Sequence, residues 1–387
     1  MPRIKVAAVK LTDYEGKRVY EAIEKSLGLL GGIDKLIRPR SNVFIKINHL
    51  SPPSPPEKAI VTHPEFTGQV IRILQKIGCR ITVGDDIQGG GRDGFLVSGY
   101  RRVCRETGAR LLNLKEAGFR KVDCGGELLK TAYVSSAVLD ADFVVNLPKL
   151  KTHALTAFTG AVKNMYGILP AGQRHRLHGE FQTNDSFSRM LVDLYAGRAP
   201  RLTIMDGVVA MEGQGPSGGT PRAAGLVLAG ADGVAVDAAA AHILGYGAEE
   251  VLTTVFARQR GVGAGDLEDI EIVGEDLASL SIRGFRKPTL AGELMRRKMP
   301  ARIYGFVSRQ MVLTPEVRRD RCTACRECIR ICPAEAISLE SGGAVIDPAS
   351  CIHCLCCNEV CRDNAIRLKR KPLNGLISAV NALIRKR

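Results

Sequence analysis

Four cysteines and a proline are packed into twelve residues near the end of this chain, in the stretch CTACRECIRICP at residues 322–333. The same spacing returns 29 residues further on, in CIHCLCCNEVC at residues 351–361, and the short apolar runs that follow each group also coincide. The region is therefore an internal duplication. Because nine of the twelve cysteines in the chain lie in it, its fold must be organised around the chemistry of thiolate sulfur.

A C-x2-C-x2-C-x3-C-P run is typical of bacterial two-cluster ferredoxins, where three cysteines bind one 4Fe-4S cluster and the fourth binds its neighbour. Residues 316–370 resemble that family over their full length. The resemblance implies two 4Fe-4S clusters, electron transfer and a small α+β ferredoxin-like domain. The implied ligands of the first cluster are Cys322, Cys325, Cys328 and Cys361, and those of the second are Cys332, Cys351, Cys354 and Cys357.

Zinc is the competing interpretation of clustered cysteines. Zinc modules usually present paired C-x2-C knuckles separated by a longer loop, so four cysteines in one run, repeated, favour iron and sulfide. Two positions depart from the ferredoxin pattern: Arg362 replaces the second proline, and Cys356 adds a thiol beside Cys357. We interpret Cys356 as a free thiol next to the second cluster.

Composition limits the remaining classes of protein. The chain has 387 residues, 45% of them hydrophobic, which is enough for two domains with a substantial core. No run reaches the ~18 apolar residues of a membrane-spanning helix, and no signal-like apolar block opens the chain, so we expect a cytoplasmic protein. The net charge of +15 suits an anionic partner or substrate, but the absence of Trp and the aromatic content of 5% disfavour nucleic acid.

Up to about residue 280, short β-rich runs alternate with helical patterns, which is typical of parallel strands joined by helical crossovers. Predicted strands lie within 41–50, 79–86, 141–153, 201–207 and 224–230, and predicted helices within 62–78 and 233–245. We therefore expect residues 1–280 to form a large α/β domain with a mainly parallel sheet.

Ligands of open parallel sheets bind beyond the carboxyl ends of the strands, so polar residues at these ends are the candidate site. The candidates for binding a substrate are Lys46, Asn48, Asp85, Asp86, Lys149, Lys151, His153, Lys163 and Asn164. Several amines beside amide groups suit the oxygens of a carboxylate or phosphate, although a solvated loop would have a similar composition. His153, His178 and Asp206 are candidate catalytic acids or bases.

Three segments of this region, VTHPEFTGQVIRILQKIGCRITVGDD, LPKLKTHALTAFTGAVKNMYGILP and DGVAVDAAAAHILG, resemble the domain-of-unknown-function 362 family. The likeness spans most of residues 1–280, and members of that family often carry a two-cluster ferredoxin module. It implies an architecture rather than a reaction. A more distant resemblance connects the region to the fold of nickel-dependent lactate racemase, but none of that family's metal-handling residues can be placed in this sequence.

Two basic segments complete the chain. Residues 281–315 are interrupted by Gly and Pro, which indicates a linker, and residues 371–387 predict a short amphipathic helix with positive charge at its end. That helix would pack on the surface of the protein itself, or dock on a partner or an anionic membrane.

These features favour an iron-sulfur oxidoreductase that relays electrons to or from an anionic small molecule held in the α/β domain, with a redox protein as its partner. No pattern specifies a further metal or organic cofactor. Two alternatives stay open. One is a non-catalytic ferredoxin-type electron carrier or assembly factor, and the other is a redox-sensing ligand-binding protein.

Overall fold

The computed structural model divides into two compact units. The first contains residues 1–87, 92–171 and 181–289, and the second contains 88–91, 172–180 and 290–387. The residues that the structure describes are 3–50, 53–87, 93–153, 155–181, 183–213, 215–288, 314–332, 334–351, 357, 363 and 365–369.

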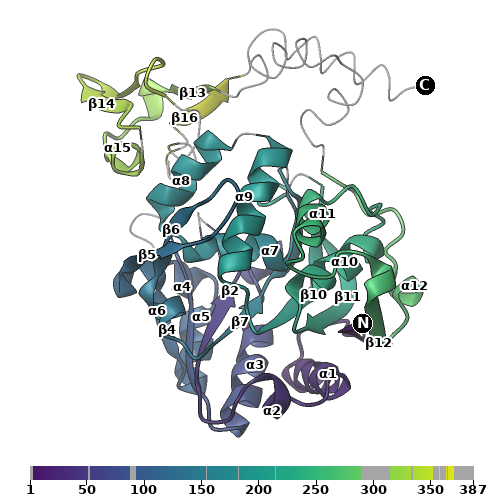
Figure 1. Cartoon of the computed structure of the whole chain (residues 1–387). Coiled ribbons are helices and arrows are strands. Elements are labelled where there is room, and N and C mark those ends of the chain that lie inside the picture. The colour runs from purple at the N-terminus through teal and green to yellow at the C-terminus, as the bar shows by residue number, and fades with distance from the viewer. Residues whose placement is uncertain are drawn as a thin grey trace. The chain divides into compact units, whose positions relative to one another are not determined.

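A ten-stranded sheet forms the centre of the first unit (Figure 1), with strand order β12-β1-β11-β10-β7-β2-β3-β4 and with β8 and β9 attached through β10. Its strands are β1 (Ile4–Lys10), β2 (Asn42–Ile47), β3 (Arg80–Asp85), β4 (Arg110–Asn113), β7 (Phe143–Leu147), β8 (Lys149–His153), β9 (Ala157–Thr159), β10 (Leu202–Glu212), β11 (Thr220–Gly230) and β12 (Ile270–Gly274). Strand β2 pairs in parallel with β3 and β7, and β7 pairs in parallel with β10.

The expectation of a mainly parallel sheet is confirmed, with two exceptions: β11 runs antiparallel to both β10 and β1, and β9 runs antiparallel to β8. The sheet is therefore mixed, although most of its pairs are parallel. Strands β10 and β11 are joined by a short loop, which can connect antiparallel neighbours but is too short for a parallel crossover. The predicted strand at 141–153 is also two strands, β7 and β8, since Pro148 between them lacks the N–H that a continuous ladder needs.

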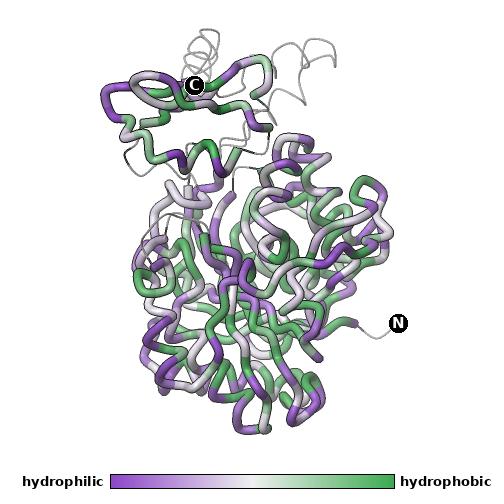
Figure 2. Tube along the Cα trace, turned by 90° about the vertical axis from the view of Figure 1, so that its left-hand side faces the viewer, coloured by the Kyte–Doolittle hydropathy of each residue, from purple (hydrophilic) through white to green (hydrophobic). Residues whose placement is uncertain are grey.

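Helices cover both faces of the sheet. On one face, α1 (Gly16–Leu29), α3 (Pro64–Lys76) and α5 (Tyr100–Thr107) pack on apolar side chains that alternate along the strands, and on the other α10 (Gly233–Ile243) and α12 (Leu277–Leu280) do so. The apolar stretches run through the interior of this unit (Figure 2). Its other helices and a separate hairpin are α2 (Ile33–Leu36), α4 (Gly94–Val97), α6 (Ser136–Leu139), α7 (Ala161–Asn164), α9 (Asn184–Gly197), α11 (Leu252–Gln259), β5 (Phe119–Asp123) and β6 (Thr131–Ser135).

The second unit contains two small antiparallel ladders. Strand β13 (Thr314–Val317) pairs with β16 (Ile366–Lys369), and β14 (Ile337–Glu340) pairs with β15 (Gly343–Ile346). Its helices are α15 (Glu327–Ile331) and α8 (Ala171–Glu180). Because β13 precedes the first cysteine and β16 follows the last, their pairing brings the two ends of the duplicated region together.

Several predictions fall on residues outside the described part of the chain. They concern most of the linker (289–313), the C-terminal helix (371–387), and the residues Cys354, Cys356, Cys361 and Arg362. Within the described residues, no helix is both long enough and apolar enough to cross a lipid bilayer.

Candidate functional site

A buried ion pair lies at the carboxyl ends of β2 and β3. The parallel register of these strands brings Lys46 beside the last residue of β3, Asp85, and Lys46 Nζ donates to Asp85 Oδ2 at 2.8 Å and to the Ile47 carbonyl at 2.7 Å. Both charges are buried, which is tolerated because each is paired. Gly167 packs against this pair so closely that a Cβ would lie 2.7 Å from Lys46 Nζ, so a side chain there would displace it.

A second buried ion pair joins β8 to β10. The register places Lys149 opposite Asp206, and Lys149 Nζ donates to Asp206 Oδ2 at 2.7 Å. The backbone N–H of His63 donates to the same oxygen at 2.9 Å. Asp206, a candidate catalytic residue, is thus a carboxylate that already accepts from an ammonium and an amide.

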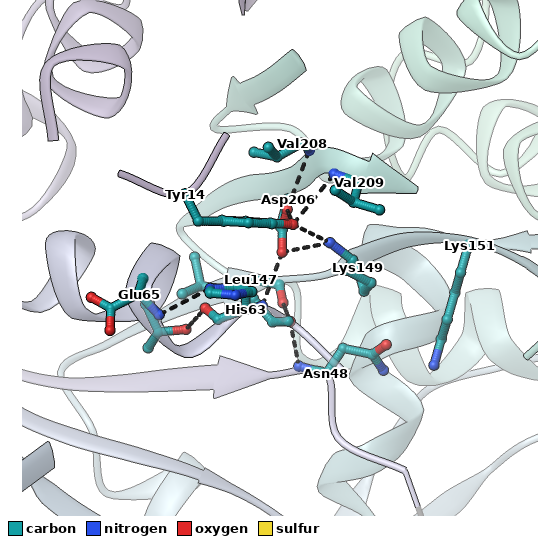
Figure 3. A network of polar contacts seen from close by, with 12 residues as sticks. Tyr14, Asn48, His63, Glu65, Leu147, Lys149, Lys151, Asp206, Val208 and Val209 are labelled. Carbon is teal, nitrogen blue, oxygen red and sulfur yellow. Dashed lines mark hydrogen bonds and ion pairs between the residues drawn. The ribbon is translucent and has the colours of Figure 1, made fainter. Parts of the chain in front are cut away.

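Tyr14 and His63 complete this network (Figure 3), and the sequence interpretation missed both. The Tyr14 hydroxyl donates to Asp206 Oδ1 at 2.8 Å and accepts from Lys149 Nζ at 2.7 Å, while its ring stacks on His63 with centroids 3.6 Å apart. Burial, and then the Asp206 charge, raise the pKa of Tyr14, whereas burial lowers the pKa of His63 to about 4. Both are therefore neutral at pH 7. His63 carried a signal only as the start of a predicted helix, and Tyr14 carried none.

A chain of side-chain amides links the ends of β2 and β7 to α7. Asn48 Nδ2 donates to Asn164 Oδ1 at 3.0 Å, Asn164 Nδ2 donates to Asn146 Oδ1 at 2.7 Å, and Asn146 Nδ2 donates to the Ala161 carbonyl at 3.0 Å. One acceptor is left over, because the buried Asn48 Oδ1 has no hydrogen-bond partner among the described residues. Asn146 was not a sequence candidate, although a polar residue inside the apolar run FVVNL was a usable signal.

Lys151 differs from the other buried lysines. Its side chain is 1% exposed, and Nζ donates to the Ile60 carbonyl at 2.6 Å but forms no ion pair among the described residues. Burial, and then the charge of Lys163, lower the pKa of Lys151 to about 7, with Lys149 and Lys46 acting in the same direction and Asp85 opposing them. A large fraction of this amine is therefore uncharged at neutral pH.

The remaining candidates occupy different surroundings. His153 ends β8, is buried, and accepts from the Leu155 N–H at 3.1 Å through Nδ1, while Asp86 is buried directly after β3. Lys163 on α7 places Nζ 4.7 Å from the centroid of the Tyr166 ring. His178 lies on α8, which groups with the second unit.

In the second unit, three of the cysteines predicted for one cluster, Cys322, Cys325 and Cys328, line a single cavity. Ala324 and Arg326, the residues on either side of Cys325, have positive φ angles of 56° and 63°, so the chain curls tightly around this cavity. Among the described residues, no three Cys, His, Asp or Glu side chains lie close enough together to hold a single metal ion. In a four-iron cluster, each cysteine binds a different iron, and the lining of one cavity by several thiols fits such a group.

Backbone N–H groups also donate hydrogen bonds to the sulfur atoms of two cysteines of the duplicated region. Ala344 N donates to Cys322 Sγ at 3.4 Å, and Ala336 N donates to Cys332 Sγ at 3.3 Å. Hydrogen bonds to ligand sulfur are among the features that set the reduction potential of an iron-sulfur cluster. These contacts fit the proposed use of the cysteines as ligands of an iron-sulfur cluster.

The fold and the cysteine site together define an α/β protein that carries an iron-sulfur binding domain. Residues 43–242 match the family described as domain of unknown function DUF362, and residues 314–337 match the 4Fe-4S binding domain. The chain belongs to the DUF362 family, which confirms the resemblance drawn from the sequence.

Similarity to individual proteins is more limited. The thylakoid-associated protein sll1697 of Synechocystis sp. is 31% identical over 241 residues, which cover 62% of this chain and 74% of that protein. Two solved structures are similar to part of this chain. The lactate racemase apoprotein from Thermoanaerobacterium thermosaccharolyticum has a TM-score of 0.38 and 13% sequence identity, and the match covers 60% of this chain and 54% of that protein. A protein from Thermotoga maritima has a TM-score of 0.33 and 16% sequence identity, and the match covers 56% of this chain and 55% of that protein.

Proposed function

We propose that this protein is an iron-sulfur oxidoreductase that binds two 4Fe-4S clusters and exchanges electrons with an anionic small molecule held among the buried lysines. The match to a 4Fe-4S binding domain supports the electron-transfer half of the proposal. When bound, such clusters supply single electrons at a potential set by their surroundings. The proposed ligands of the two clusters are the two sets of four cysteines assigned from the duplicated spacing.

The anionic substrate is supported by one observation, which is that the buried Lys151 has no carboxylate partner among the residues that the structure describes. The two neighbouring lysines are neutralised by Asp85 and Asp206, but Lys151 faces the added positive charge of Lys163. A bound carboxylate or phosphate would give Lys151 the directly paired negative charge that Asp85 and Asp206 give to the other two lysines, and would be held more strongly there than in water because the site is buried.

The test is anion binding by protein purified without oxygen. We expect titration calorimetry with oxalate and inorganic phosphate to detect binding of at least one of them to the wild-type protein. The variant Lys151→Met should lose at least tenfold in affinity, while its iron and sulfide content stays the same. Lys17→Met is the matched control, because the Lys17 side chain is 80% exposed.

Wild-type protein with complete clusters and no affinity for either anion would overturn the substrate half of the proposal. The ferredoxin-type carrier would then be the better reading, since it needs only the clusters and a docking surface.

A further inference from the structure

We infer that Lys151 is a nucleophilic amine that forms an imine with a carbonyl group of the bound anion, and that 2-oxo acids are therefore the substrate class of this site. The inference rests on the proposed function and makes it more specific. It assigns to Lys151 a covalent role and to its neighbours the work of keeping its amine reactive and of holding the substrate carboxylate.

The first support is that two lysines on one strand have different hydrogen-bond partners. Side chains two residues apart on a strand share a face, so Lys149 and Lys151 both point from β8 into the same buried region, and each is 1% exposed. Lys149 is paired with Asp206 at 2.7 Å, which opposes the lowering of its pKa by burial. Lys151 has a backbone carbonyl as its partner instead, so no carboxylate fixes a proton on it. Desolvation beside another cation is the arrangement that activates a lysine as a nucleophile.

The second support is the charge of the surroundings. Lys163 from α7, Lys149 from β8 and Lys46 from β2 all oppose protonation of Lys151, and Asp85 from β3 is the group that opposes them. The cations that keep the amine neutral would also attract the carboxylate of a 2-oxo acid. One set of charges thus serves both the nucleophile and its substrate.

The third support is the unpartnered oxygen of Asn48. Figure 3 draws Asn48 and Lys151 in the same buried region with no hydrogen bond between them, and Asn48 Oδ1 is buried without a hydrogen-bond donor among the described residues. A buried acceptor without a donor costs about 1–3 kcal/mol. Addition of an amine to a ketone creates a carbinolamine hydroxyl, which is a donor that this oxygen lacks.

The step is balanced without any other reagent. The Lys151 nitrogen bonds to the carbonyl carbon, the bond from that carbon to oxygen breaks, and the oxygen leaves as water with the two hydrogens of the amine. Nothing is oxidised or reduced, so the step is independent of the state of the clusters.

The experiment is reductive trapping in the full-length protein, purified without oxygen. Pyruvate and cyanoborohydride are added, and the protein is digested and mapped by mass spectrometry. We expect a reduced pyruvate adduct on Lys151 in at least tenfold excess over that on exposed Lys17. Oxalate, which has the carboxylate charge but no ketone, should suppress this adduct and form none itself.

Mapping on the wild-type chain makes the result independent of how well any variant folds. Lys151→Arg then serves to show that the trapped position is lost while a cation of similar length is kept. Oxalate binding by calorimetry with no adduct at Lys151 would overturn the imine and leave the anionic site standing. Absence of both oxalate and phosphate binding would instead remove the proposed substrate site, and with it the inference.

Discussion

At the scale of single residues, the three buried lysines show how similar sequence positions acquire different chemistry. Lys46 and Lys149 are paired with carboxylates 39 and 57 positions away in the chain, and Lys151 has no such partner among the described residues. The sequence predicted all three near strand ends, because an apolar run followed by lysines is a local pattern, whereas Lys149 and Lys151 lie at the start and in the middle of β8. It could not tell which of them is paired, since each partner comes from another strand.

Lys151 should make stability depend on pH. Its pKa is lowered from 10.5 to about 7 in the folded protein, so between these values the unfolded chain carries a proton that the folded chain lacks. Unfolding then takes up a proton, and raising the pH disfavours it by about 1.4 kcal/mol per pH unit from this group. We expect the unfolding free energy of the wild-type protein, relative to Lys151→Met, to rise between pH 7 and pH 10 in urea titrations.

The matched control is Lys17→Met, whose stability relative to wild type should be nearly independent of pH over the same range, because that side chain is exposed. Parallel pH curves for wild type and Lys151→Met would show that Lys151 keeps its proton in the folded state. That result would also argue against its role as a nucleophile.

At the scale of elements, most of the strands and helices were predictable because each repeats a short pattern. The strand at 79–86 and the helix at 62–78 are observed as β3 and α3 within a few residues of their predicted ends. The direction of β11 was not predictable from its own apolar run, which reads alike in parallel and antiparallel neighbours. The length of the connection before it was the better signal.

The β14–β15 hairpin should control the cluster for which Cys322 is a proposed ligand. Gly343 has a φ of 135°, and a Cβ there would lie 3.0 Å from Cys322 Sγ, next to the Ala344 N–H that donates to that sulfur. We expect Gly343→Ala to displace this N–H and lower the reduction potential of one cluster, because the bond favours the more negative reduced state. Potentiometric titration followed by electron paramagnetic resonance measures the shift.

Gly342→Ala is the control for backbone strain. Gly342 also has a positive φ, 99°, but a Cβ there would meet only the Arg319 side chain, at 3.8 Å. Each substitution costs about 1–2 kcal/mol of strain, so equal potentials in the two variants would mean that the contact of Gly343 with Cys322 has no effect on the cluster.

At the scale of the whole molecule, the number of clusters is the quantity to measure. Two crossed 4Fe-4S clusters predict about eight iron and eight sulfide per chain. Cys322→Ala should lower both to about four, because it removes a ligand of only one cluster. Cys79→Ala is the control, since Cys79 is buried in the core of the α/β unit and should leave the iron content unchanged.

About four iron in the wild-type protein, purified without oxygen, would limit the chain to one cluster. Zinc in place of iron would overturn the electron-transfer function, since zinc does not change its oxidation state.

The iron-sulfur character of this protein was predictable from its sequence alone, because cysteine ligands must be closely and regularly spaced to reach one cluster and such spacing is local. Most strands and helices were predictable in the same way, because the repeat of apolar residues that marks each of them depends on neighbouring residues alone. The joining of Tyr14 and His63 to Lys149 and Asp206 could be seen only in the folded protein, as could the lack of a carboxylate partner for Lys151 among the described residues. The pairing and burial of these side chains depend on which distant segments of the chain pack together in the sheet and its helices, and a local sequence pattern does not contain that information.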